Sequence, residues 1–181
     1  MKPIVYVSSN EAKFHEVEAS LAGLDIEWRR IQLPDILSIE PEKLITAKAR
    51  LAFRELQGPF FMDHTGLYFG EYDFKLPGCI IDVMLEVVGN KGLCRALGAD
   101  RRARAQTTML YCDGMRFHLL HAATDGEVVT EPSGSGFGWD PIFLPTGASM
   151  TYGDMPETQR YEFSSRTKTC KQLRELLSTL R

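Results

Sequence analysis

The amino-acid sequence predicts a single α/β domain, residues 1–181, in which a mixed β-sheet is flanked by helices. Short apolar runs typical of buried strands alternate with longer segments whose apolar residues recur at helical spacing. The dipeptide Asp113-Gly114 between two strand-like segments is a strong hairpin signal and adds an antiparallel pair. The length suits one domain with a proper core, and no linker or repeat divides the chain.

The N-terminal third shows the alternation directly. The run Ile4–Val7 is apolar throughout and ends at small polar residues, as a buried strand does. Pro41 suits the first turn of a helix, and Gly58-Pro59 ends that helix. The elements expected here are strands over 4–7, 27–31 and 60–62, a helix ending near Gly23, and a second helix from Pro41 to about Leu56.

The remainder continues the pattern. A turn is expected at Leu76-Pro77-Gly78, with a helical stretch after it. Strands over 104–112 and 116–123 flank the hairpin turn, and the glycine-rich stretch 133–138 is a loop. The last helix is marked by leucines at positions i, i+3, i+4 and i+7, namely Leu173, Leu176, Leu177 and Leu180.

Composition excludes several classes of protein. Hydrophobic residues make up 44% and charged residues 25%, as in soluble globular domains. A net charge of -3 argues against a protein that coats nucleic acid. No run approaches the roughly 18 apolar residues of a membrane span, and the N-terminus has no signal-peptide pattern. Four scattered cysteines without a CxxC pair favour reduced thiols and a cytoplasmic protein.

The first candidate site is the segment Ser8-Ser9-Asn10-x-x-Lys13. A strand that ends in small polar residues and opens a helix presents backbone N–H groups, and the helix dipole favours phosphate there. Lys13, in the first helical turn, could reach a phosphate oxygen. Asn10 could equally be an ordinary N-cap.

The second candidate is the set Glu40, Asp63 and His64. Asp63 follows a buried strand directly, where α/β folds tend to place active groups. Carboxylates, together with substrate phosphates, are the usual ligands of Mg²⁺. In the alternative interpretation, Asp63 starts a turn and His64 lies on the surface.

The third candidate is Gly136-Phe137-Gly138-Trp139-Asp140-Pro141. Aromatic faces can stack on a purine base, and the carboxylate of Asp140 can accept a base N–H. A glycine-rich turn with core aromatics would give the same pattern.

The fourth candidate is Ser164-Ser165-Arg166, at the start of the last helix. The guanidinium of Arg166 could donate a fork of hydrogen bonds to a base carbonyl. Ser164 could instead serve only as the N-cap of that helix.

In this order and spacing, the four pieces resemble the inosine triphosphate pyrophosphatase family from about Ile4 to Leu177. The most specific stretch is 136–143, Gly-Phe-Gly-Trp-Asp-Pro-Ile-Phe, with Met155-Pro156 after it. Further matches to the family's motifs are Ser8, Asn10 and Lys13, Glu40, Lys48 and the turn Leu76-Pro77-Gly78.

The resemblance implies an elongated mixed sheet between two lobes, a nucleotide in a central cleft, and a homodimer. It implies a pyrophosphohydrolase that uses Mg²⁺ and releases a nucleoside monophosphate and pyrophosphate. Apart from the resemblance, Mn²⁺ is the expected alternative if an imidazole ligates the ion. Lys13 and Lys48 would hold phosphates and Glu40 would hold the metal. The base would lie against the third candidate site, at Phe137, Trp139 and Asp140.

Three departures from the family pattern fall in the expected site. The family's acidic residue followed by Asp is Asp63-His64, so His64 stands at the catalytic Asp position. A neutral imidazole can ligate a metal, although Mg²⁺ prefers oxygen, or act as a general base. The family's Ser-His-Arg is Ser164-Ser165-Arg166, and an expected Lys is Arg160.

These departures leave three functions open. The first is a nucleoside triphosphate pyrophosphohydrolase with shifted base preference. The second is a nucleotide-processing enzyme of different chemistry, such as a nucleotide N-glycoside hydrolase, and the third is a nucleotide-binding protein without catalysis. A His64 that acts as ligand or base would make activity fall as the pH drops through its pKa, about 6.5 for an unperturbed imidazole.

Overall fold

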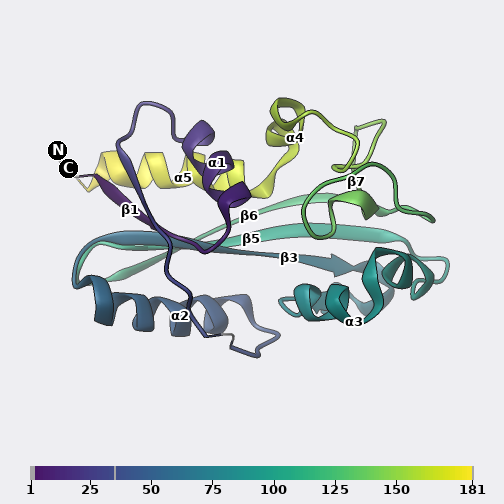
Figure 1. Ribbon diagram of the computed structural model, residues 1–181, viewed down its shortest axis with the longest axis horizontal. Coiled ribbons are helices and arrows are strands. Elements are labelled where there is room, and N and C mark those ends of the chain that lie inside the picture. The colour runs from purple at the N-terminus through teal and green to yellow at the C-terminus, as the bar shows by residue number, and fades with distance from the viewer. Residues whose placement is uncertain (1–2, 35, 181) are drawn as a thin grey trace. The chain divides into compact units, whose positions relative to one another are not determined.

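The computed structural model describes residues 3–34 and 36–180 (Figure 1). Its elements are β1 (Ile4–Val7), α1 (Glu11–Ser20), β2 (Ile26–Arg29), α2 (Pro41–Leu56), β3 (Phe60–Phe69), the 3-10 turn η1 (Gly70–Tyr72), β4 (Pro77–Gly78), α3 (Ile81–Arg95), β5 (Arg102–Cys112), β6 (Phe117–Val128), the 3-10 turn η2 (Asp140–Ile142), β7 (Phe143–Pro145), α4 (Glu157–Phe163) and α5 (Ser165–Thr179).

The strands form one mixed sheet, as the sequence predicted. Its order is β2-β1-β3-β5-β6-β7, and β4 pairs with β3. Strand β1 is parallel to β2 and β3, whereas β3–β4 and β6–β7 are antiparallel pairs. Tyr6 lies opposite Trp28 on one side and Phe61 on the other. Because β1 and β3 are parallel and in this register, the loop after β1 and the middle of β3 lie at the same level of the sheet.

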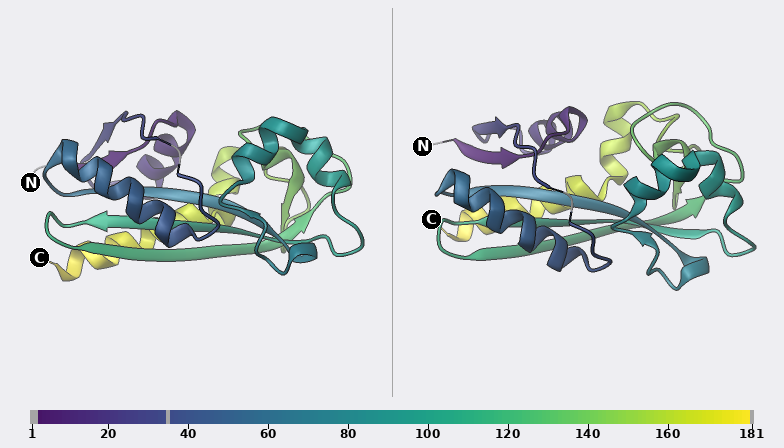
Figure 2. Two further views of the ribbon diagram at one scale, coloured as in Figure 1. Left: turned by 90° about the horizontal axis from the view of Figure 1, so that it is seen from below. Right: turned by 60° about the horizontal axis from the view of Figure 1, so that its bottom comes forward.

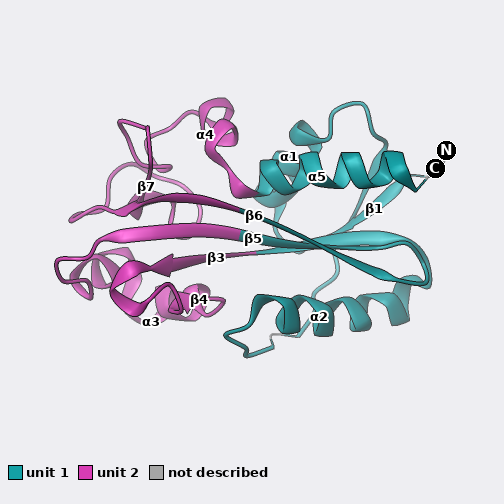
Figure 3. Ribbon diagram, turned by 180° about the vertical axis from the view of Figure 1, so that it is seen from behind, with its two compact units in different colours: residues 1–64, 107–122, 166–181 teal, residues 65–106, 123–165 magenta. Residues whose placement is uncertain are grey.

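The chain divides into two compact units (Figure 3). Unit 1 comprises residues 1–64, 107–122 and 166–181, and unit 2 comprises residues 65–106 and 123–165. Strands β3, β5 and β6 contribute residues to both units. Each unit has a core of its own.

In unit 1 a core lies on each face of the sheet. One face packs against α1 and α5 around Tyr6, Val17 and Leu173. The opposite face packs against α2 around Ile45 and Phe60. In the view from below in Figure 2, α2 lies in front of the strands and α5 behind them. Each of these helices is buried through one apolar side. Of the leucines that marked the last helix, Leu173 is buried, whereas Leu180 is 48% exposed.

The core of unit 2 collects side chains from β3, α3, β5 and the segment 139–155. Phe143 is fully buried there, and Trp139 and Tyr152 pack against its ring. Helix α3 is interrupted at Gly89, whose φ of 65° lies in the left-handed region that glycine favours.

Several expectations needed correction. The strand expected over 60–62 continues to Phe69, so Asp63 and His64 lie within β3 and do not follow it, and the strand expected over 116–123 continues to Val128. Helix α4 was not predicted, because it is short and contains no buried residue to set a periodicity. Strand β2 begins and ends earlier than the expected 27–31, since its pairing with β1 covers only Ile26 to Arg29. Within the described ranges, no helix is both long and apolar enough to cross a membrane.

Packing around Phe143 gives a test of the unit 2 core. Phe143→Ala should lower the free energy of unfolding by about 3–5 kcal/mol, because it removes a fully buried ring and leaves a cavity. Phe137, 55% exposed in the loop before it, is the matched control, and Phe137→Ala should stay within about 0.5 kcal/mol of wild type. Urea unfolding of the two variants measures both values; equal losses would contradict this description of the core.

Candidate active site

A buried carboxylate, Asp63, is the centre of the candidate site in unit 1. Its side chain has no exposed area, and it lies on β3. It accepts hydrogen bonds from the hydroxyl of Tyr6 at 2.5 Å and from Nε of Arg166 at 3.0 Å. The ammonium of Lys13 is 3.9 Å from the same carboxylate. The sequence named Asp63 as a candidate site residue but did not anticipate these partners.

Arg166 is held between two carboxylates. Its Nη1 donates to Glu16 at 2.6 Å, while its Nε donates to Asp63. Glu16 is buried, at 5% exposure, and lies one helical turn after Lys13 on α1. The guanidinium that the sequence assigned to a base carbonyl is therefore engaged by two carboxylates inside unit 1.

The charges of this network stabilise one another. Burial by itself raises the pKa of Asp63, but Arg166 and Lys13 outweigh it and hold that pKa below the ordinary value. Burial likewise opposes the charge on Arg166, yet Asp63 and Glu16 raise its pKa well above the usual range. The pKa of the Tyr6 hydroxyl is raised by burial and by the neighbouring Asp63. At neutral pH the site therefore contains an anionic Asp63, a cationic Arg166 and a neutral Tyr6.

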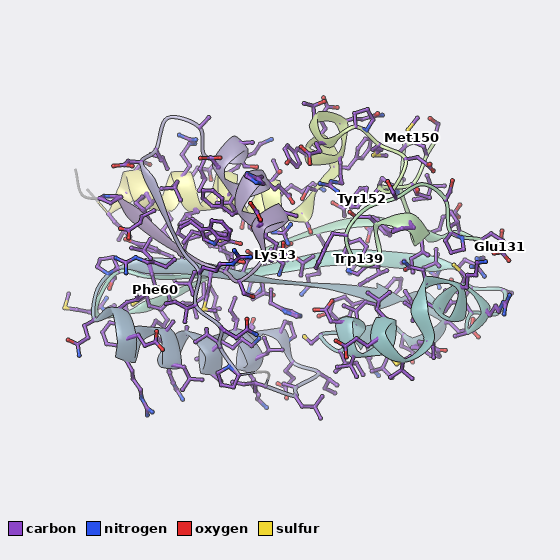
Figure 4. All side chains as sticks on the ribbon, in the orientation of Figure 1. Lys13, Phe60, Glu131, Trp139, Met150 and Tyr152 are labelled. Carbon is purple, nitrogen blue, oxygen red and sulfur yellow. The ribbon has the colours of Figure 1, made fainter. Side chains whose placement is uncertain are left out.

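The loop between β1 and α1 is held by local hydrogen bonds at the start of the helix. The side chain of Asn10 accepts from the backbone N–H of Lys13 at 3.1 Å, so Asn10 is the N-cap of α1. The hydroxyl of Ser8 accepts from the backbone N–H of Asn10 at 3.1 Å. Figure 4 labels Lys13 on α1. The capping interpretation of Asn10 is thus confirmed, and capping itself places Lys13 in the first turn.

His64 differs from its neighbour in having an unsatisfied ring nitrogen. Its Nε2 is shielded from solvent and has no hydrogen-bond partner among the described residues. Burial lowers the pKa of His64 to about 3; Lys13 and Lys48 act in the same direction, and Asp63 opposes them. The expectation of a titration near pH 6.5 is therefore wrong for the protein without ligand: the imidazole is neutral throughout the physiological range.

The predicted metal ligands do not gather into one cluster. Glu40 caps α2 without a side-chain capping bond, and its carboxylate is paired with Lys43 at 2.6 Å in an exposed position. Across residues 3–34 and 36–180, no three Asp, Glu, His or Cys side chains are arranged to hold a metal ion. Asp63 already accepts from cationic and hydroxyl donors. Glu40, Asp63 and His64 thus do not form a preformed Mg²⁺ site in this arrangement.

In unit 2 the expected base-binding segment is tied to an arginine. The carboxylate of Asp140 accepts from Nη1 of Arg160 at 2.7 Å and from the backbone N–H of Phe137 at 3.1 Å. A Cβ at Gly136 would lie 2.8 Å from the side chain of Asp140, so glycine permits this close approach. Asp140 and Arg160 are therefore brought together, and they fix the loop that carries Phe137.

The two aromatic residues of this segment have different environments. Trp139 stacks on Tyr152 with ring centroids 6.1 Å apart and meets Phe143 edge-on. Figure 4 labels Trp139 and Tyr152. The ring of Phe137 is 55% exposed. Of the two, Phe137 offers the more accessible face, whereas Trp139 is largely part of the core.

Ser164 and Ser165 lie between α4 and α5 and are both buried, at 7% and 3% exposure. Ser165 begins α5, one residue before Arg166. Sequence reasoning missed Tyr6 and Glu16. A signal for Glu16 was present, because it is a charged residue beside Val17 on the buried side of α1.

The pKa of His64 can be tested through stability. A histidine whose folded pKa lies below its unfolded value of about 6.5 costs stability as the pH falls below 6.5, because only the unfolded chain binds the proton. Wild type should lose up to about 1.4 kcal/mol per pH unit more than His64→Asn between pH 6.5 and 4.5. His15→Asn at an exposed position is the control for the substitution itself, and at pH 7 its free energy of unfolding should stay within about 0.5 kcal/mol of wild type. Parallel slopes for wild type and His64→Asn in urea titrations would refute the neutral, buried His64.

The similarity to known proteins extends over nearly the whole chain. The model of the Ham1 family matches residues 4–176. The dITP/XTP pyrophosphatase of Thermococcus kodakarensis is 29% identical over 174 residues, covering 93% of this chain and 94% of the relative. The inosine triphosphate pyrophosphatase of Puccinia graminis f. sp. tritici is 31% identical over 187 residues, covering 97% and 96%.

The fold agrees with a solved structure. A HAM1 protein from Coxiella burnetii superposes with a TM-score of 0.83 at 24% identity, and the match covers 99% of this chain and 100% of that one. The resemblance predicted from the sequence motifs is confirmed, and this chain belongs to the Ham1 family.

Proposed function

We propose that this protein hydrolyses purine nucleoside triphosphates, with non-standard bases such as those of dITP and XTP as the substrates, to a nucleoside monophosphate and pyrophosphate. The observation that carries the proposal is the family match over nearly the whole chain, with relatives that are named as pyrophosphatases of these nucleotides. The basic residues beside Asp63 and His64 support it, because a triphosphate needs cations.

The phosphates would bind at the loop Ser8–Asn10 and at the first turn of α1. Backbone N–H groups and the helix dipole favour an anion there. Lys13 and Lys48 would neutralise the phosphate oxygens. Both lysines are close enough to His64 to lower its pKa, and His64 lies beside the loop. Asp63 keeps the ammonium of Lys13 close to this position.

His64 would receive the proton from the attacking water. Water attacks the α-phosphorus, the bond to the β-phosphate oxygen breaks, and pyrophosphate leaves. A pKa of about 3 makes the imidazole too weak a base in the ligand-free protein. Two of the causes of that low value are Lys13 and Lys48. Burial is the largest cause, but phosphate oxygens that neutralise these lysines would raise the pKa of His64 and make it a stronger base when the substrate is bound.

Mg²⁺, or Mn²⁺ in its place, is the divalent ion we propose, and it would enter on the phosphates rather than occupy a site held by the protein alone. Two observations support entry of the ion together with the phosphates. Glu40 is paired with Lys43 and belongs to no group of three possible metal ligands among the described residues, and Asp63 is bound by Arg166. Bound Mg²⁺ commonly keeps one or two carboxylates together with substrate phosphates. The ion supplies charge neutralisation to the phosphates when bound.

The base would stack on the exposed face of Phe137, with Trp139 supporting the loop from within the core of unit 2. Arg160, held in place by Asp140, is a donor suited to a base carbonyl. Ser164, Ser165 and Arg166 would contribute through the junction of α4 and α5, where Ser164 and Arg166 match the family motif and Ser165 departs from it.

The buried environment of Asp63 disfavours the alternative of an N-glycoside hydrolase. Glycoside cleavage needs carboxyl groups that face the sugar and stabilise an oxocarbenium-like transition state. Asp63 instead faces Tyr6 and Arg166. A catalytically inactive nucleotide-binding protein remains the competing outcome of the assay below.

A homodimer and a cytoplasmic location are also proposed. The exposed valines of α3, Val83 and Val87, at 54% and 76% exposure, offer an apolar surface to a second copy. Four buried cysteine thiols suit a reducing compartment.

Product analysis should decide between the three functions. Incubation with dITP, XTP, ATP and GTP, with their monophosphates as controls, should release pyrophosphate from triphosphates only, and faster from dITP and XTP. Free base from any nucleotide would instead reveal glycoside cleavage. Binding without any product would identify a nucleotide-binding protein.

His64→Asp tests the departure at the catalytic position. The substitution adds a negative charge beside Asp63 and supplies oxygen ligands. We expect Mn²⁺ binding to the nucleotide-free protein, measured by equilibrium dialysis, to be weak in wild type and to rise at least tenfold in His64→Asp. Activity of wild type should be better with Mn²⁺ than with Mg²⁺, and the variant should prefer Mg²⁺. A variant with the metal preference and rate of wild type would show that His64 has no role in the site.

A further inference from the structure

Trp28 contacts the proposed phosphate-binding loop from a neighbouring strand. It lies on β2, opposite Tyr6 of β1, and its indole Nε1 donates to the backbone carbonyl of Ser8 at 2.8 Å. The backbone N–H of Ser8 donates to the carbonyl of Arg29, the next residue of β2, at 3.2 Å. Strand β2 therefore holds both backbone polar groups of Ser8.

The same indole also packs on α1. Its ring is stacked on Phe14, with centroids 4.7 Å apart and planes inclined by 7°. Phe14 directly follows Lys13 in the first turn of the helix. The guanidinium of Arg30 lies 5.3 Å from the centre of the Trp28 ring. One side chain thus fixes the start of the loop by a hydrogen bond and its end by ring stacking.

The hydrogen bond determines which way a peptide group points. In a trans peptide the carbonyl of one residue and the N–H of the next point in opposite directions. With the Ser8 oxygen turned toward Trp28, the N–H of Ser9 is directed away from the indole. A peptide flip would exchange the two and could present a carbonyl oxygen to an anion, which is repulsive. The bonds inside the loop, between Ser8, Asn10 and Lys13, are local and do not fix this orientation relative to the sheet.

We propose that Trp28 is a positioning residue for pyrophosphate and nucleotide phosphates, because its indole N–H sets the orientation of the Ser8–Ser9 peptide and its ring fixes the first turn of α1. This inference rests on the proposed function, in which that loop receives the phosphates. Trp28 itself touches neither substrate nor reacting atoms.

Trp28→Phe is the test, since phenylalanine keeps a ring against Phe14 and removes only the N–H donor. Isothermal titration with inorganic pyrophosphate should show a Kd about tenfold weaker than wild type, as expected for loss of one ordering hydrogen bond. The KM for dITP should rise by a similar factor, and kcat should change less. Tyr72→Phe is the matched control in unit 2. It removes a side-chain donor to the carbonyl of Ala96 at 3.1 Å and should leave the pyrophosphate Kd unchanged.

Wild-type protein provides a second measurement that does not require the variant to fold. If the hydrogen bond from Trp28 to Ser8 strengthens pyrophosphate binding about tenfold, bound pyrophosphate must stabilise that hydrogen bond by the same factor. Saturating pyrophosphate should therefore slow solvent exchange of the Trp28 indole N–H by about tenfold. With only two tryptophans, the indole signals of ¹⁵N-labelled protein are assigned by Trp139→Phe.

A wild-type Kd in folded Trp28→Phe, or unchanged indole exchange on pyrophosphate binding, would overturn the role of Trp28 and leave the proposed function intact. Failure of wild type to bind pyrophosphate, with or without Mg²⁺, would overturn the phosphate site itself and the inference with it. Lower thermal stability with an unchanged Kd would show a structural role only, and so would also overturn the proposal.

Discussion

The buried carboxylate of Asp63 is the constraint on which the arrangement of unit 1 depends. An ionised carboxylate without exposed area is strongly unfavourable unless cations and hydrogen bonds compensate it. Arg166 provides the main compensation, but a buried guanidinium has the same difficulty and needs a second carboxylate. Glu16 meets that need from α1. The network therefore fixes α1 and the start of α5 to β3, and removal of one partner would leave an uncompensated charge, a loss of about 3–5 kcal/mol in comparable buried pairs.

This network also explains how the site differs from one designed around a metal ion. Asp63 and Glu16 are directed at Arg166, so their charges are largely balanced within the protein. Lys13 and Lys48 then face a neutral His64 rather than a second carboxylate. An Asp at position 64 would add a negative charge beside Asp63, and two adjacent carboxylates are suited to binding a cation. With His64 in its place, the function proposed above has the phosphates bind first and supply ligands to the divalent ion.

Much of this fold could be predicted from the sequence because its signals are local. The apolar run Ile4–Val7, the N-cap at Asn10 and the hairpin at Asp113-Gly114 each depend on neighbouring residues. The partners in the site could not be predicted in the same way. Asp63 and Arg166 are 103 residues apart, and no periodicity indicates that they meet. The pKa of His64 was likewise inaccessible, because it depends on burial and on lysines from two different helices.

The two candidate loops, one in each unit, share a physical requirement. Phosphates and bases are recognised partly by backbone groups, whose direction depends on peptide orientation rather than on residue type. Each loop is accordingly fixed by a side chain from outside it. Trp28 donates to the carbonyl of Ser8 in unit 1, and Asn90 donates to the carbonyl of Gly138 at 3.0 Å in unit 2. Asn90 directly follows the interruption of α3 at Gly89. A residue type can therefore be decisive for recognition without touching the ligand, because it determines whether the backbone presents an N–H or a carbonyl oxygen.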